Sequence, residues 1–348
     1  MILSKIKKDI KKVFLVLFLS EFLYIMFIPV YTFLFMSKNS PLINVNMDMK
    51  SRAALFGIFF AIISLASVLS NPIFGSLSDV FGRKKILLLS IISLIFVSIA
   101  SIVSIFLKNL FLFMISYTIF QFLFSFKSVS LASIVDLSEE KTKNKNIYLF
   151  QFFIGIAACI APIIGGNLVK NSYFIPFLLG LIMSSCVYFY IKIYLKETLD
   201  VKSKKRVLAH YKLNKMLPIF TNKKIILLMG LLVFDQLYWG TYYNFMPVLC
   251  KAVFNFDSVA VGLFLSLLGV YLMISTGGIL PVLQKKISNK KITSIACLSL
   301  LCSSILLFLA LIFPMAPFAI VFVWSSGFLA AFGDVTIFCN ILYWHQAM

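Results

Sequence analysis

Three ionisable side chains lie deep inside long apolar stretches of this sequence: Glu21, Lys127 and Asp235. In hydrocarbon such groups are costly, and they pair with one another or face a water-filled cavity, so each is a functional candidate. An acid in that setting takes up and releases a proton or attracts a cation. We predict that Glu21 and Asp235 carry protons or bind substrate, with Lys127 as the counter-charge. The alternative is that they make only structural polar contacts.

The predicted depths of these groups favour a specific pair. At 1.5 Å per residue along a helix, Glu21 is expected roughly 12 Å and Lys127 roughly 13 Å from the same membrane face. Because these depths match, we expect an ion pair between them, which relieves the cost of burying either charge alone. Proton binding at Glu21 would then release Lys127. Asp235 is the expected counterpart of Glu21, roughly 16 Å deep.

Aromatic residues accompany both acids at helical spacing. Acids flanked by aromatic rings suit a cationic, amphiphilic substrate through charge and cation–π contacts. The alternative is that the rings only pack or lie at the membrane interface. The five predicted cavity aromatics are Tyr24, Tyr31, Tyr238, Trp239 and Tyr242.

The stretches that hold these residues are built for lipid. Of 348 residues, 61% are hydrophobic and 13% are charged, whereas a soluble domain has about 45–50% apolar and about 25% charged residues. By the length of about 20 residues per span, we expect an all-α, polytopic membrane protein with about ten transmembrane helices. The expected spans are 13–35, 54–76, 86–107, 110–135, 147–169, 173–195, 225–250, 259–283, 291–313 and 316–343.

The strongly basic balance reflects membrane topology. The net charge of +20 comes from 32 Lys and Arg against 12 Asp and Glu. Most of the basic residues lie at the N-terminus or in alternate gaps between spans, a pattern that places the N-terminus in the cytoplasm. A nucleic-acid-binding domain instead gathers them on one water-exposed face. We therefore expect a bacterial inner (plasma) membrane protein that contacts the lipid bilayer and no nucleic acid.

Other chemistries find no support in the sequence. Its six cysteines lie within or beside apolar stretches, without CxxC spacing or companion histidines, so we predict neither a metal site nor a disulfide framework. We also find no nucleophile–base set and no phosphate-binding loop. The expectation is a monomer that is not an enzyme and has no cofactor.

The two halves of the sequence resemble each other. At one constant offset, the segment from Pro281 to Lys291 aligns with the segment from Gly75 to Lys85, keeping a Leu and a Lys pair but losing the Asp and both glycines. Parallel repeats of this kind are common in transporters. We predict an N-terminal six-helix bundle at 1–195, a basic cytoplasmic linker at 196–224, and an incomplete C-terminal bundle at 225–348.

A short polar segment joins the second and third spans, and we expect it to be a tight cytoplasmic loop. Its glycines permit a turn and close helix approach, and its Asp and Arg, four residues apart, are placed to form an ion pair across the turn. The pattern resembles the signature of the major facilitator superfamily, which implies two helical bundles, alternating access and a latch at this loop. The predicted gating residues are Gly75, Asp79, Gly82, Arg83 and Lys84.

The fifth span narrows the resemblance. Ala161-Pro162-Ile-Ile-Gly165-Gly166 is similar to the helix-5 motif of drug:proton antiporters, with Ala161 in place of a glycine. Small residues let helices approach closely and proline bends a helix. The spacing from Asp136 to Pro162, and the Leu195-Lys-Glu-Thr ending of the sixth span, resemble the tetracycline-efflux branch. The resemblance implies proton-coupled efflux of small organic molecules such as drugs or toxic metabolites.

Two departures from that branch leave alternatives open. Tyr117 stands where these antiporters carry an arginine, and the last two of twelve helices appear to be missing, including the one expected to receive Asp79. The alternatives are a proton-coupled importer of a nutrient or metabolite, and a truncated remnant that does not transport.

Overall fold

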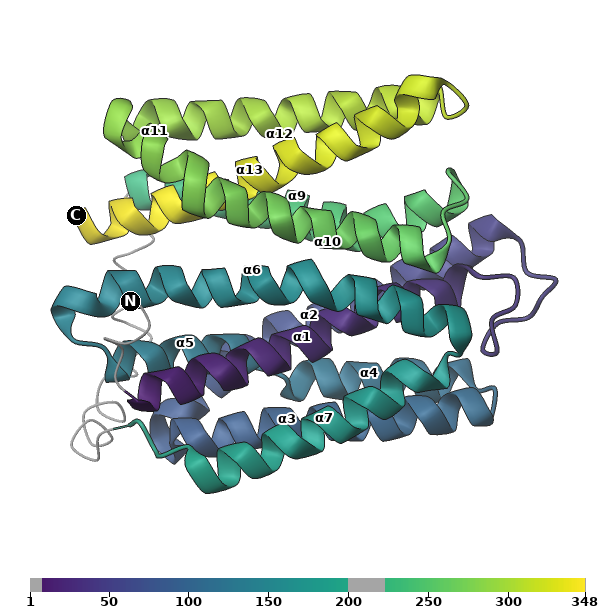
Figure 1. Cartoon of the computed structure of the whole chain (residues 1–348), viewed down its shortest axis with the longest axis horizontal. Coiled ribbons are helices and arrows are strands. Elements are labelled where there is room, and N and C mark those ends of the chain that lie inside the picture. The colour runs from purple at the N-terminus through teal and green to yellow at the C-terminus, as the bar shows by residue number, and fades with distance from the viewer. Residues whose placement is uncertain (1–7, 200–222, 348) are drawn as a thin grey trace. The chain divides into compact units, whose positions relative to one another are not determined.

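The computed structural model describes residues 8–199 and 223–347, and within these ranges the chain is helical with no β-strand (Figure 1). The predicted all-α class is therefore confirmed. The first helices are α1 (Lys8–Met36), α2 (Met49–Phe81), α3 (Arg83–Phe106), α4 (Leu110–Leu123), α5 (Phe126–Leu137), α6 (Glu140–Asn171) and α7 (Phe174–Tyr194). The others are α9 (Lys223–Ala252), α10 (Ser258–Ile274), the π-helical turn η4 (Ser275–Ile279), α11 (Leu280–Lys286), α12 (Asn289–Ile312) and α13 (Pro317–Ala347).

The described helices have the length and surface of membrane spans. Nine of the helical stretches in the described residues are long and apolar enough to cross a membrane. The tenth expected span, 225–250, lies in α9, which is not among the nine and carries Asp235 and Gln236 in mid-helix. Large apolar side chains such as Phe106 and Phe111 are 77% and 73% exposed, which is the surface that lipid requires. The chain is therefore an integral membrane protein.

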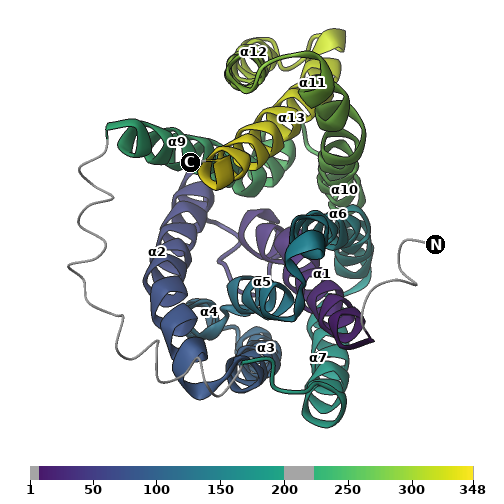
Figure 2. The same cartoon turned by 90° about the vertical axis from the view of Figure 1, so that its left-hand side faces the viewer.

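The contacts divide the chain into two units, unit 1 (Met1–His210) and unit 2 (Tyr211–Met348). In unit 1, α1 packs along α6, α3 along α7, and α2 against α4; Figure 2 views these helices nearly end-on. In unit 2, α13 packs against α12, α10 and α9. Most of the predicted linker, from 200 to 222, lies outside the described residues, and the predicted domain bounds stay a prediction.

Helix α1 forms the centre of unit 1. In its most apolar 18-residue window, 78% of the residues are buried, against 28% for α2. Since α1 contacts α2, α5, α6 and α7, it is enclosed on several sides. A side chain on α1 is therefore placed in the interior of the unit, and this is where Glu21 lies.

The fourth span, expected at 110–135, is present at Leu110–Leu137, but it is broken into two helices. Helix α4 ends at Leu123 and α5 begins at Phe126. The freed backbone groups are satisfied by Ser90, whose hydroxyl donates to the Leu123 carbonyl and accepts from the Ser125 N–H, both at 3.3 Å. Such partners are what tolerate a helix break at membrane depth. The 259–283 span is interrupted similarly, by the π-helical turn η4.

The predicted loop between the second and third spans is almost absent. Helix α2 continues to Phe81 and α3 starts at Arg83, so only Gly82 lies outside a helix, with φ +105°. Gly82 thus supplies the expected turn. Gly75 lies within α2, and a Cβ atom there would meet nothing within 4 Å. The expected turn at Gly75 is therefore wrong, because α2 still runs through this position, and its role in gating stays a prediction.

Candidate functional site

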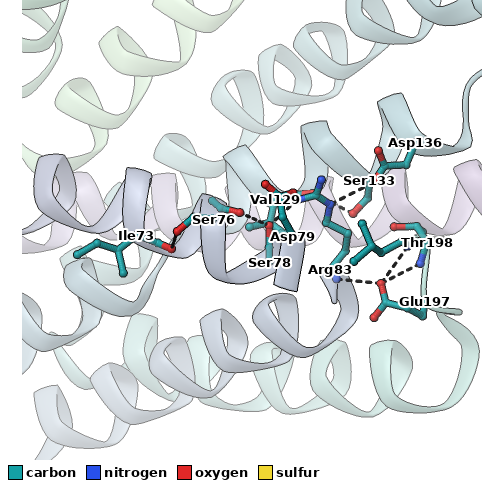
Figure 3. Close-up of polar contacts among 12 residues, drawn as sticks. Ile73, Ser76, Ser78, Asp79, Arg83, Val129, Ser133, Asp136, Glu197 and Thr198 are labelled. Carbon is teal, nitrogen blue, oxygen red and sulfur yellow. Dashed lines mark hydrogen bonds and ion pairs between the residues drawn. The ribbon is translucent and has the colours of Figure 1, made fainter. Parts of the chain in front are cut away.

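Arg83 is the centre of a charged network at the α2–α3 junction (Figure 3). It forms ion pairs with Asp79, at 2.5 Å, and with Asp136, whose Oδ2 is 3.1 Å from Nε. It also donates to the hydroxyl of Ser78. Asp79 and Ser78 belong to the last turns of α2, whereas Asp136 is near the end of α5. One side chain thus ties together three helices, and the expected pairing of Asp79 with Arg83 is present.

Glu197, just beyond α7, caps the start of α3 from a distance. Its Oε1 accepts a hydrogen bond from the Arg83 N–H at 2.8 Å and its Oε2 accepts one from the Lys84 N–H at 3.3 Å. A carboxylate at this position satisfies free N–H groups and faces the positive end of the helix dipole. The side chain of Lys84 donates to the Lys192 carbonyl of α7 at 2.9 Å. The end of α7 is therefore fastened to the junction from both sides.

Two constraints require glycine at position 82: its backbone conformation and the closeness of Glu197. A Cβ atom there would lie 2.3 Å from Oε2 of Glu197. The sequence pattern of Glu197 and Asp136 was noted as a family likeness, but their contacts with Arg83 were not predicted. The two residues lie far from Arg83 along the chain, 114 and 53 positions away, so local spacing carries no signal for either contact.

In unit 1, Glu21 is buried, with 5% exposure. Tyr24, one turn along α1, lies near the side chain of Gln121 and within electrostatic range of Glu21. Lys127, near the start of α5, is exposed and acts electrostatically on Glu21. Among the described residues no Glu21–Lys127 contact within 4 Å is recorded. The structure brings the two groups near one another, and a direct ion pair stays a prediction.

The predicted cavity aromatics of unit 1 lie in an aromatic cluster. The ring of Tyr31 is about 6 Å, centroid to centroid, from those of Phe56, Phe59 and Tyr117. Tyr24 stacks on Phe124 at 5.4 Å, next to the break in the fourth span. Tyr117, at the position expected for an arginine, is thus part of the packed interior. Substrate contact by Tyr24 and Tyr31 stays a prediction.

The α6 motif marks a close approach between helices. A Cβ atom on Gly165 would lie 2.2 Å from the carbonyl oxygen of Met26 in α1 and 3.0 Å from Pro29 Cγ. Pro162 lies inside α6 and Pro29 inside α1, and Gly166, next to Gly165, is buried. Only glycine allows α6 to lie against α1 at this point.

Two acids meet in the interior of unit 2. Asp235 of α9 and Asp334 of α13 are 2% and 7% exposed. The side-chain amide of Gln236 donates to Asp334 Oδ1 at 3.1 Å and to Asp235 Oδ2 at 3.4 Å, so one amide nitrogen bridges the two carboxyl groups. Asp334 was not among the predicted site residues, and its link to Asp235 through Gln236 was not predicted.

The aromatic residues after Asp235 separate into two environments. Tyr238 donates to Ser303 at 2.8 Å, and the Tyr242 hydroxyl is 2.7 Å from that of Ser326. Both tyrosines line a cavity of about 460 Å³, together with Thr241, Phe245, Met246, Leu249, Ser304, Leu307, Phe308 and Leu311. Trp239 instead packs on Tyr243, with ring centroids 5.5 Å apart. Tyr238 and Tyr242 therefore share a cavity between α9 and α12.

Comparison with known proteins places this arrangement in a family. The model of the Major Facilitator Superfamily matches residues 13–348. Two curated proteins are similar over part of their length. The chain is 22% identical over 231 residues to the tetracycline resistance protein, class H, of Pasteurella multocida, covering 66% of this chain and 57% of that protein. It is 28% identical over 159 residues to the proton-coupled folate transporter of Bos taurus, covering 42% and 34%. The matched part therefore spans little more than half of one relative and a third of the other.

Solved structures share the fold. A D-xylose–proton symporter superposes with a TM-score of 0.71 at 16% identity, over 94% of this chain and 80% of that one. The human organic anion transporter MFSD10 superposes with a TM-score of 0.62 at 18% identity, over 97% and 93%. At these identities the likeness concerns the fold alone. With the family model matching nearly its whole length, the chain belongs to the Major Facilitator Superfamily.

Proposed function

We propose that this protein is a secondary transporter that couples proton movement to the efflux of small organic molecules, such as drugs or toxic metabolites, by alternating access. The observation that carries the proposal is a buried carboxyl group in each unit, Glu21 and Asp235, with 5% and 2% exposure. In an apolar interior the charged form of a carboxyl group is much less stable than the neutral form. Binding of a proton can therefore favour the conformation that buries the group, and its release can favour one that exposes the group to water.

Efflux is supported by two likenesses. The match to a tetracycline resistance protein covers two thirds of this chain, and the close approach at Gly165 is formed by residues that resemble the antiporter motif. The predicted bundles, 1–195 and 225–348, would rock about the linker 196–224. The protein would act as a monomer in a bacterial plasma membrane, with its N-terminus in the cytoplasm.

The network around Arg83 would be the cytoplasmic gate latch. It fastens the ends of α2, α5 and α7 to the start of α3 through Asp79, Asp136 and Glu197. Opening requires that some of these contacts break, and an ion pair that is partly buried resists this. Lys84 and Gly82 would support the same latch, Lys84 through its bond to α7 and Gly82 through its turn.

The substrate class follows from the aromatic residues near the acids. Tyr238 and Tyr242 line the cavity between α9 and α12, and Tyr24 lies within electrostatic range of Glu21. A cationic amphiphile would place its charge near a carboxylate and its apolar part against aromatic rings. In the coupled cycle Glu21 would take up a proton and so weaken its electrostatic hold on Lys127.

Proton-coupled import is the second candidate, favoured by the 28% identity to the proton-coupled folate transporter. The two directions differ in which preparation accumulates the substrate. An importer gives proton-driven uptake into whole cells, whereas an exporter fills inverted vesicles. A protein that accumulates substrate in neither preparation would be a remnant that does not transport.

The test uses inverted vesicles that contain the full chain, an imposed proton gradient and a cationic dye. We expect accumulation by the unmodified protein and its loss in Glu21→Gln. The matched control is Asp257→Asn, at the N-cap of α10, where asparagine caps a helix as well as aspartate does. Accumulation that survives Glu21→Gln unchanged would contradict the assignment of Glu21 to coupling.

A further inference from the structure

One amide nitrogen holds the carboxyl groups of Asp235 and Asp334 together. The side chain of Gln236 donates to Asp235 Oδ2 at 3.4 Å and to Asp334 Oδ1 at 3.1 Å, and both acids are buried. An ionised carboxylate only accepts hydrogen bonds, whereas a protonated carboxyl group can also donate one. Two buried acids that share a single amide donor therefore favour one proton on one of the two groups, and the amide stabilises either position of that proton.

Charge repulsion gives the same result. Two carboxylates that share one site cannot both be ionised without a large energetic cost, so one of them keeps its proton while the other is charged. Here the cost is increased by burial among the apolar helices α9, α12 and α13. The pair therefore titrates as a unit rather than as two independent acids.

A second feature points to a ligand at this place. Oδ1 of Asp235 is buried and has no hydrogen-bond partner among the described residues, and the residue as a whole is only 2% exposed. An acceptor without a partner in such a setting is costly if it carries charge. Protonation of Asp235 removes most of that cost.

We propose that Asp235 and Asp334 form one proton-binding site in unit 2, which holds a single proton shared between their carboxyl groups. Proton uptake forms an O–H bond on a carboxylate oxygen, and proton release returns the proton to water and leaves that group as a carboxylate. Gln236, which bridges the pair, is itself exposed. Proton binding stands on the geometry alone, and only its use in driving transport rests on the proposed function.

Two thiols lie near the pair. Cys297 of α12 lies within electrostatic range of Asp235, and Cys339 of α13 lies within that of Asp334. Thiols ordinarily titrate at higher pH than carboxyl groups, at about 8.5. A titration below that range therefore reports on the acids.

The experiment measures protonated carboxyl groups in the purified full-length protein by infrared spectroscopy across pH. We expect a carboxyl band that disappears as one proton is released and is absent from the double variant Asp235→Asn/Asp334→Asn. Either single variant should lower the pH midpoint by about 1 unit or more, because the like charge is gone. Glu21→Gln and Asp257→Asn should leave this band unchanged.

Three outcomes would overturn the proposal: a midpoint that stays the same in Asp334→Asn, a double variant that binds two protons fewer than the unmodified protein, or the lack of any carboxyl band that the double variant removes. Where a single variant fails to fold, Gln236→Leu serves instead. It removes a donor to both groups and should raise the midpoint, and an unchanged midpoint contradicts the shared site. Proton binding at the pair without dye accumulation overturns the proposed function, whereas accumulation without this proton overturns the site.

Discussion

The same helix junction is present in both units, but only one copy is cross-linked. In unit 1, α2 and α3 meet at Gly82, and Arg83 binds Asp79 and Asp136. In unit 2, α11 and α12 meet at Ile287 and Ser288. The flanking lysines there are exposed and form no ion pair among the described residues; they are Lys285, Lys286, Lys290 and Lys291.

This difference separates two roles that such a junction can have. Basic residues at a membrane face fix topology wherever they lie, and both junctions keep them. A latch additionally needs an acid and a tight turn, and only the junction of unit 1 has kept these. The junction of unit 2 has no such charge pairing among the described residues. We therefore predict that a substitution at the α11–α12 junction is tolerated, whereas the substitution at the aligned position of the α2–α3 junction is not.

Replacing Arg83 with alanine should have the largest effect. It leaves Asp79 and Asp136 without their cation, and removing one partner of a largely buried pair costs about 3 kcal/mol. We expect a lower thermal unfolding midpoint and a strong loss of transport. The matched control is Asn289→Ala, at the aligned position of unit 2, which should change stability by about 0.5 kcal/mol or less. Equal effects at both positions would contradict the comparison.

Replacing Gly82 with alanine should have the next effect. Its backbone has φ +105° and a Cβ atom would lie 2.3 Å from Glu197, so the residue is strained and the cap on α3 is displaced. We expect destabilisation of about 2 kcal/mol. The aligned residue Ser288 has φ −69° and makes no side-chain cap bond, so Ser288→Ala should be nearly silent. Thermal unfolding of both variants in the same detergent measures the difference.

The smallest effect concerns the aspartate that caps α2. Hydrogen bonds from the Ser51 hydroxyl and N–H hold the pKa of Asp48, the N-cap of α2, below its usual value. Because the folded-state pKa is depressed, this stabilisation is present above about pH 3.9 and is lost as the pH falls through the folded-state pKa. The difference in unfolding midpoint between the unmodified protein and Asp48→Asn should shrink in that range. A difference that is constant with pH would refute it.

The fold and one ion pair of the site could be predicted from the sequence, because both depend on residues that are close together in the chain. The length of the apolar stretches predicts the spans, and the four-residue spacing of Asp79 and Arg83 predicts their pairing. The break at Phe124 and Ser125 has no proline or glycine to announce it, because it depends on a hydroxyl of another helix, Ser90.

The remaining contacts depend on residues far apart in the chain. Gln236 and Asp334 are separated by 98 positions, and Arg83 and Glu197 by 114. Periodicity within one helix gives the face on which each residue lies, but it does not give the neighbour that packs there. The sequence therefore identified Asp235 as a charge that is costly to bury, but it did not identify Asp334 as the acid beside it.

The single-residue junction at Gly82 has a mechanical consequence. Unless the last turns unwind, the angle between α2 and α3 is set by two torsions, φ and ψ of Gly82. The two helices behave as a lever with one joint, and the carboxylate of Glu197 sits against that joint. The end of α7 is then the stop that limits how far the lever swings.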